Sequence, residues 1–134
     1  MLAMPNDINA IAGWAGILVG LLVGVVFGTS FHRADWLGGY TSWPRRMLRL
    51  GHISFFGIAL LNLAYAVTVK YLGWPAPPTF VSVALASANV LMPAACGLAA
   101  WRPWLRHVFV VPVTCVVGAV AGLLWSRFSA WGAM

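Results

Sequence analysis

Four long apolar segments dominate this sequence, and they constrain its fold more than any other feature. They cover residues 8–31, 44–72, 79–101 and 103–128. Each contains a stretch of about 20 residues apolar enough to cross the hydrocarbon core of a bilayer as a helix. The chain is 62% hydrophobic and only 7% charged. An ordinary water-soluble domain is less hydrophobic and contains a larger fraction of charged residues. The sequence therefore predicts an all-α integral membrane protein, a single domain of four transmembrane helices spanning residues 1–134.

The connections between these segments are short, and this limits how the helices can be arranged. Residues 73–78 (GWPAPP) separate the second segment from the third, and Arg102-Pro103 separates the third from the fourth. Helices joined so closely are expected to be antiparallel neighbours. The simplest solution is an up-down-up-down bundle in which the first helix closes against the fourth.

Positive charges lie mainly on one side of the expected spans, which predicts how the chain is oriented. One side carries six and the other two: Arg33, Arg45, Arg46, Arg49, Arg102 and Arg106 against Lys70 and Arg127. The positive-inside rule then places both termini outside, in a multi-pass protein of the cell (inner) membrane. The net charge of +6 belongs to residues beside spans, so we expect no nucleic-acid partner. Because no Lys or Arg precedes the first span, we expect it to be retained and not cleaved as a signal peptide.

Two rows of small residues occur at helical spacing. The first helix carries Gly13, Gly16, Gly20, Gly24 and Gly28, and the fourth carries Thr114, Gly118, Gly122 and Ser126. Such rows allow helix backbones to approach closely in lipid, which is their most common role. The alternative is that the missing side chains leave room for a flat ligand, a porphyrin or quinone ring, between helices.

The histidines extend the same faces. His32 lies four residues after Gly28, and His107 seven before Thr114. If the first and fourth helices pack through their glycine faces, both imidazoles meet near the cytoplasmic boundary, with His52 at a similar depth. His32 and His107 would then be axial ligands of a b-type haem iron, and arginines would pair with its propionates. The candidate cofactor-binding residues are His32, His52, His107, Arg45, Arg49 and Arg106. The alternative is that these histidines contact only solvent or lipid.

The residue types that are rare in this sequence also exclude some functions. The only acids, Asp7 and Asp35, lie outside the middle of any span, so proton antiport through a buried carboxylate is disfavoured. No nucleophile and base occur in a recognisable pattern, and Cys96 and Cys115 form no CxxC pair, so we do not expect an autonomous enzyme. Asn62 and Asn89 are expected to meet by hydrogen bonding across the second and third helices.

Three functions remain. The first is a small integral subunit of a membrane-embedded electron-transfer complex of the respiratory type, which ligates a b-type haem or borders a quinone site at the cytoplasmic side. The second is a cofactor-free structural or assembly subunit of a membrane complex. The third is a small oligomeric transporter or channel. All three imply contact with membrane lipid and with other membrane subunits or further copies of the chain.

Overall fold

The four expected transmembrane helices are present in the computed structural model, which describes residues 5–132. In chain order the helices are α1 (Pro5–Phe31), α2 (Trp43–Lys70), α3 (Thr79–Trp101) and α4 (Val110–Trp131). Two short 3₁₀ segments, η1 (Trp36–Gly38) and η2 (Pro103–Phe109), precede α2 and α4. All four helices are long and apolar enough to span a membrane, so the chain is a multi-pass membrane protein.

The fourth span differs from its expected form, because its first part is a 3₁₀ helix. The apolar segment continues from Pro103 to Trp131, yet the α-helix begins only at Val110. Pro112 has no N–H to donate to the carbonyl of Val108, so the usual α-helical hydrogen bond is missing there. The tighter 3₁₀ turns fill the interval between Pro103 and the start of α4.

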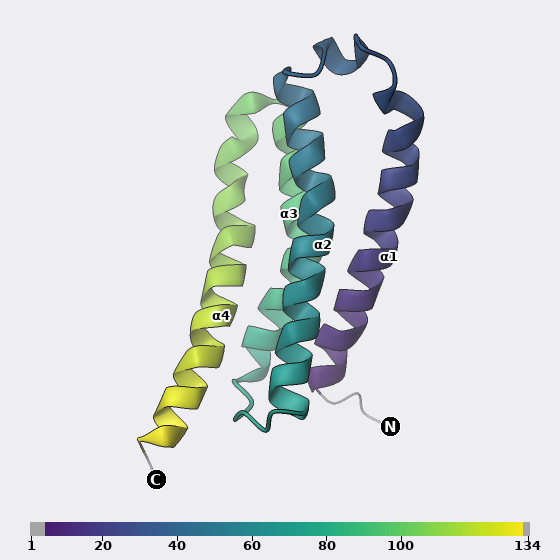
Figure 1. The fold of residues 1–134 in the computed structure, drawn as a ribbon. Coiled ribbons are helices and arrows are strands. Elements are labelled where there is room, and N and C mark those ends of the chain that lie inside the picture. Colours follow the sequence, from purple (N-terminus) through teal and green to yellow (C-terminus); the bar gives the residue numbers. More distant parts are fainter. Residues whose placement is uncertain (1–4, 133–134) are drawn as a thin grey trace.

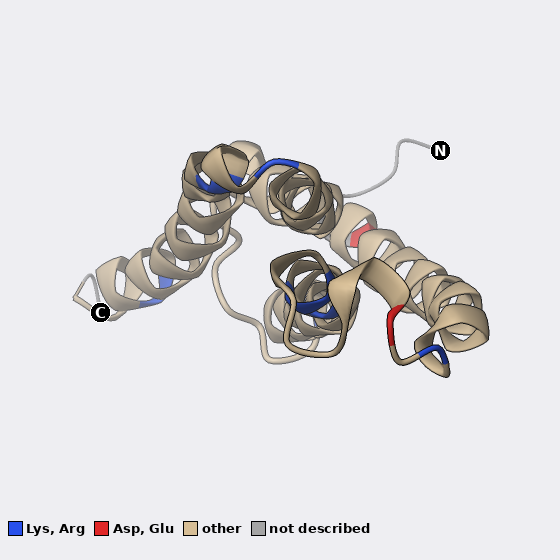
Figure 2. Cartoon of the chain, turned by 90° about the horizontal axis from the view of Figure 1, so that it is seen from above, with Lys and Arg blue, Asp and Glu red and all other residues tan. Residues whose placement is uncertain are grey.

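Consecutive helices run in opposite directions, but the bundle is not closed in the expected way (Figure 1). α1 packs against α2 and α3, α2 packs against α3, and α4 packs against α3. The expectation that the first helix closes against the fourth is wrong, since α1 and α4 lie on opposite sides of the central pair (Figures 1 and 2). α1, α2 and α3 form a three-helix unit, and α4 is attached to it along α3.

The glycine row of α1 explains this choice of neighbours. A Cβ added to Gly13 or Gly24 would collide with Leu63 or His52 of α2, and one added to Gly20 would be in tight contact with Phe56. A Cβ on Gly16 would collide with the amide of Asn89 on α3. The row therefore brings helices close together, as expected, but it receives side chains from α2 and α3. On α4, Gly122 receives Val81 of α3, whereas Gly118 has open space beside it.

The apolar core lies where α2, α3 and α4 meet, toward the end that carries the chain termini (Figure 1). It consists of Tyr65, Val69, Val81, Leu85 and Ala119, with Val116 and Leu123 packed against it. Between α2 and α3 the buried residues are mostly small, including Ala59, Ala66, Ala88, Ala95 and Ala99. Small side chains allow these two helices to approach closely, which gives α4 and α1 a rigid support.

Candidate functional site

Arg45, one of the predicted cofactor residues, binds the end of α1. It lies in the first turn of α2 and is only 3% exposed. Its Nη2 donates to the carbonyl of Phe31 at 2.8 Å, and its Nη1 lies 3.3 Å from the carbonyls of Arg33 and Ala34. The last carbonyls of a helix lack partners within the helix, and a cation is favoured beside them. The Arg45 guanidinium therefore caps the C-terminal end of α1.

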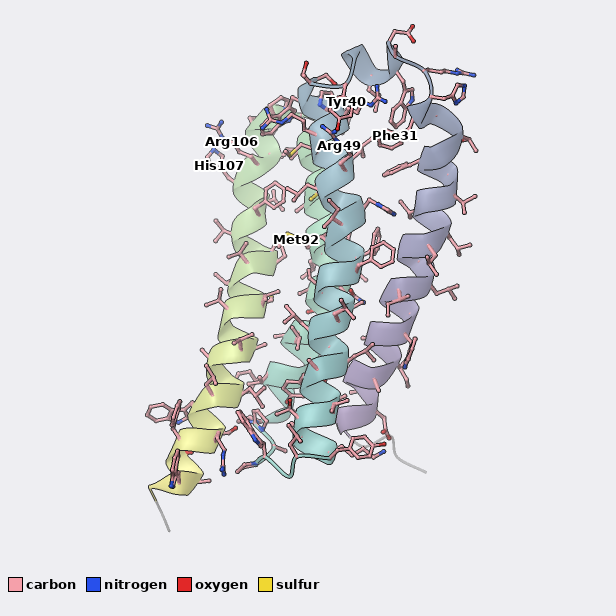
Figure 3. All side chains as sticks on the ribbon, viewed as in Figure 1. Phe31, Tyr40, Arg49, Met92, Arg106 and His107 are labelled. Carbon is pink, nitrogen blue, oxygen red and sulfur yellow. The ribbon has the colours of Figure 1, made fainter. Side chains whose placement is uncertain are left out.

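Aromatic rings surround the same guanidinium and its neighbour. The Cζ of Arg45 lies 5.0 Å from the ring centre of Phe31 and within 6 Å of two further rings, Trp36 and Tyr40. Arg49 lies 4.2 Å above the ring of Tyr40 and donates from Nη2 to the Tyr40 carbonyl at 3.1 Å (Figure 3). These cation–π contacts hold the connection between α1 and α2. Both arginines are thus occupied by their own chain.

His52 is also occupied, by a contact between helices. Its Nε2 lies 3.1 Å from the carbonyl oxygen of Gly20 on α1, beside the space that Gly24 leaves open. The contact requires the tautomer in which Nε2 carries the proton. The ring meets Phe56 edge-on at 5.3 Å and tilts against Phe27 at 6.0 Å. His52 is therefore positioned as part of the α1–α2 interface.

The other predicted residues do not form a site together. His32 follows the end of α1, whereas Arg106 and His107 belong to η2, and all three are exposed. Arg106 and His107 lie on the α4 side of the molecule, across the central pair from α1 (Figure 3). The expectation that α1 and α4 bring His32 and His107 face to face is therefore wrong. Within residues 5–132, no three His, Cys, Asp or Glu side chains are grouped closely enough to hold a metal ion.

A buried polar cluster connects α1, α2 and α3 toward the end that carries the chain termini. Asn9 donates from Nδ2 to Oδ1 of Asn62 at 2.7 Å and to the carbonyl of Ser82 at 3.1 Å, and the Ser82 hydroxyl donates to Oδ1 of Asn9. Asn62 in turn donates to the carbonyls of Ile58 and Leu85. Because every donor and acceptor of both amides is used, the cluster stabilises the three-helix unit.

Sequence reasoning missed Asn9 and assigned Asn62 the wrong partner. Asn62 bonds to Asn9 and does not meet Asn89, whose Nδ2 donates to the carbonyl of Ala12 on α1 at 2.6 Å. The available signal was an asparagine inside the first apolar segment, because its side-chain amide has to form hydrogen bonds within the membrane. Asn9 is fully buried, and so is Asn62.

A groove runs between α2 and α4, with α3 as its floor. Its wider part encloses about 530 Å³ and is lined by Ser54 and Gly57 of α2, Met92 of α3 and Val113 of α4, among others. A narrower part of about 170 Å³ continues along Ala64 and Thr68. Leu61 lines both parts, so the two adjoin along α2. Together we call them the α2–α4 groove.

A second groove opens on the other side of the molecule, between α1 and α3. It encloses about 510 Å³, and its walls are Ala12, Ala15 and Gly16 on α1 and Asn89, Pro93 and Ala94 on α3. Phe55 of α2 lies at its base. We call it the α1–α3 groove.

These features define a class of protein, a four-helix integral membrane protein with two open lateral grooves and a network of internal polar contacts. No protein-family model, curated protein or solved structure significantly matches this chain. Its function therefore has to be argued from its own residues.

Proposed function

We propose that this chain is a structural subunit of a membrane complex, in the cell (inner) membrane, and that it binds a transmembrane helix of another subunit in the α2–α4 groove. The observation that carries this proposal is the length of the groove. Its lining residues on α2 extend from Leu50 to Thr68, which at 1.5 Å per residue is about 27 Å. This nearly equals the hydrocarbon thickness of about 30 Å, so the groove matches the length over which a transmembrane helix could contact α2.

The composition of the groove favours a helix over lipid chains as its occupant. Gly57, Ala64, Ser54 and Thr68 face it, and a Cβ on Gly57 would meet open space. Small and hydroxyl-bearing residues are characteristic of helix contacts in membranes, because they allow close backbone approach and hydrogen bonding. Their presence beside a hollow that the described helices leave open supports an external partner.

The fixed contacts of α2 support a structural role over a cofactor-ligating one. Arg45, Arg49 and His52 each bond to α1 or to the connection after it, so they hold α2, which is one wall of the groove, against α1. A rigid wall reduces the entropy lost when a partner helix binds.

Site-specific photo-crosslinking in membranes tests this proposal. A photoreactive residue placed at Ser54 or at Ala64 should crosslink to one and the same partner, and one placed at exposed Ala121 on α4 should not. Gly57→Leu should fill the groove and abolish both crosslinks, whereas the matched Ala121→Leu variant should retain them. Crosslinks at all three positions, or only to lipid, would contradict the proposal. A product of twice the chain mass would mean a second copy in place of a different subunit.

A redox role is the second candidate, and the α1–α3 groove is the observation that favours it. The groove is lined mostly by small residues, and its volume of about 510 Å³ is sufficient for a quinone ring. Haem ligation by His32 and His107 lacks support, because their helices do not pack together. A reduced-minus-oxidised spectrum of the complex purified in mild detergent tests haem. A b-type α band that disappears in His107→Ala would restore the haem hypothesis, and a colourless preparation would count against it.

A further inference from the structure

We propose that the α1–α3 groove is a binding site for a hydroxylated aromatic molecule with an apolar tail, such as an alkylphenol or a quinol. This inference is independent of the structural role proposed above, because it concerns the opposite side of the molecule. Four features of the groove point to this ligand: an unpaired buried oxygen, a missing backbone donor, an aromatic ring and apolar walls.

The unpaired oxygen belongs to Asn89. Its amide is almost fully buried, at 6% exposure, and its Nδ2 is held by the Ala12 carbonyl at 2.6 Å. The Oδ1 of the same amide has no hydrogen-bond partner. Among the described residues only two other buried side-chain atoms lack partners, Ser42 Oγ and Arg45 Nε, and both belong to the interfacial end of α2. Asn89 lies at the middle of α3, where water is scarce and an unsatisfied acceptor is costly.

A second acceptor is present at the same residue. Pro93 lies four positions after Asn89 within α3 and has no N–H, so the main-chain carbonyl of Asn89 lacks its normal helical donor. Both Asn89 and Pro93 line the groove. Asn89 therefore carries two acceptors without their usual donors, and an O–H group of a ligand satisfies one of them.

Gly16 is the residue against which the Asn89 amide packs. A Cβ at Gly16 would lie 2.8 Å from Oδ1, so the amide itself occupies the space that the missing side chain leaves in the wall. Because Oδ1 is buried there, the Asn89 side chain has to turn toward the groove for a hydroxyl to reach this oxygen.

The remaining walls select the body of the ligand. Apart from Asn89 the groove is lined by apolar residues, most of them Ala or Val, and by the ring of Phe55 at its base. An aromatic ring packs favourably against Phe55, and an alkyl tail can follow the walls into the lipid. No charged residue lines the groove, so anionic headgroups and ionised ligands are disfavoured. A volume of about 510 Å³ lies within the range of small-molecule sites.

A matched pair of ligands tests the donor requirement. Isothermal titration into protein-loaded nanodiscs, corrected for partition into empty nanodiscs, should show para-pentylphenol binding about tenfold more tightly than its methyl ether, the ratio expected for one hydrogen bond. A decyl benzoquinol and the corresponding benzoquinone form a second pair. Tighter binding of this quinol than of the phenol would identify a quinol as the ligand, and the reverse order a simple phenol. Equal binding within both pairs would overturn the proposal.

Three variants locate the site. Ala94→Leu should reduce phenol binding at least tenfold by filling the groove, whereas the matched Ala121→Leu on exposed α4 should leave it unchanged. Pro93→Ala restores a backbone donor to the Asn89 carbonyl, so it should lower the preference for phenol over ether while the helix is retained. Asn89→Leu should abolish that preference, and circular dichroism would establish that the variant is folded. Wild-type binding by Ala94→Leu would also overturn the proposal.

Discussion

The Nη2 of Arg45 donates a 2.8 Å hydrogen bond to the carbonyl of Phe31, and this bond joins the start of α2 to the end of α1. Fourteen residues separate the two positions, and the chain between them carries the rings that stack on Arg45 and Arg49. A charged residue thus joins the adjacent ends of two transmembrane helices. This use accounts for an arginine that is almost completely buried.

Arg45→Met should destabilise the protein, because it removes the hydrogen-bonding cation from the carbonyls at the end of α1. Hydrogen bonds to charged groups contribute about 1.5–3 kcal/mol, so we expect a loss of roughly that size. Unfolding in mixed micelles, followed by circular dichroism, measures it. Arg46→Met is the matched control, since Arg46 is exposed, and it should be nearly neutral. Equal effects of the two variants would refute a capping role for Arg45.

Gly16→Ala should destabilise the α1–α3 contact, because its new methyl group would collide with the Asn89 amide. Overpacking of this kind costs about 1–3 kcal/mol. Gly28→Ala is the control, since a Cβ there meets nothing within 4 Å. The melting temperature in detergent should fall for Gly16→Ala and stay unchanged for Gly28→Ala. A similar fall for both variants would contradict this prediction. It would show that replacing a glycine lowers stability even where the new methyl group collides with nothing.

Asn9 and Asn62 should be energetically coupled, because their side-chain amides are hydrogen-bonded at 2.7 Å. A double-mutant cycle with Asn9→Ala and Asn62→Ala should give about 0.6 kcal/mol, and at most about 1.7 kcal/mol, as measured for such bonds in membranes. The pair Asn9 and Asn89, between which no bond is formed, serves as the control and should be additive. Coupling of equal size in both cycles would be inconsistent with a direct bond.

The three histidines should differ in their effect on stability. His52→Ala removes the contact with Gly20 and the edge-on packing with Phe56, so we expect a loss of about 1–2 kcal/mol. His32→Ala and His107→Ala change exposed side chains and should stay within about 0.5 kcal/mol of wild type. Thermal unfolding of the three variants in one detergent makes the comparison. A large loss of stability in His107→Ala would mean that this exposed side chain has a structural role that its contacts within the chain do not explain.

The orientation of the chain is a separate prediction, and it depends on the six-to-two distribution of positive charge. Alkaline phosphatase fused to the C-terminus should be active, because that enzyme folds only outside the cytoplasm. Green fluorescent protein at the same position should remain dark. Fusions truncated after Arg102 should behave in the opposite way. Fluorescence from the C-terminal fusion would reverse the assigned orientation.

What the sequence determined is the set of helices. Hydrophobic length fixes where a chain can cross a bilayer, because backbone groups in lipid have to be bonded within the segment itself. The four spans follow from this rule. The 3₁₀ start of the fourth span was not foreseen, although Pro112 carried a local signal for it.

Only the tertiary structure decided which faces meet. A row of glycines permits close approach by any neighbour, so the row on α1 was equally compatible with α4 and with the α2–α3 pair that it contacts. The roles of the polar residues depended on that choice. With α1 beside α2, Arg45, Arg49 and His52 bond to it and to the connection after it, and His32 and His107 are separated. Spans are encoded by local composition, whereas partners are selected by side-chain fit across helices, which no single segment specifies.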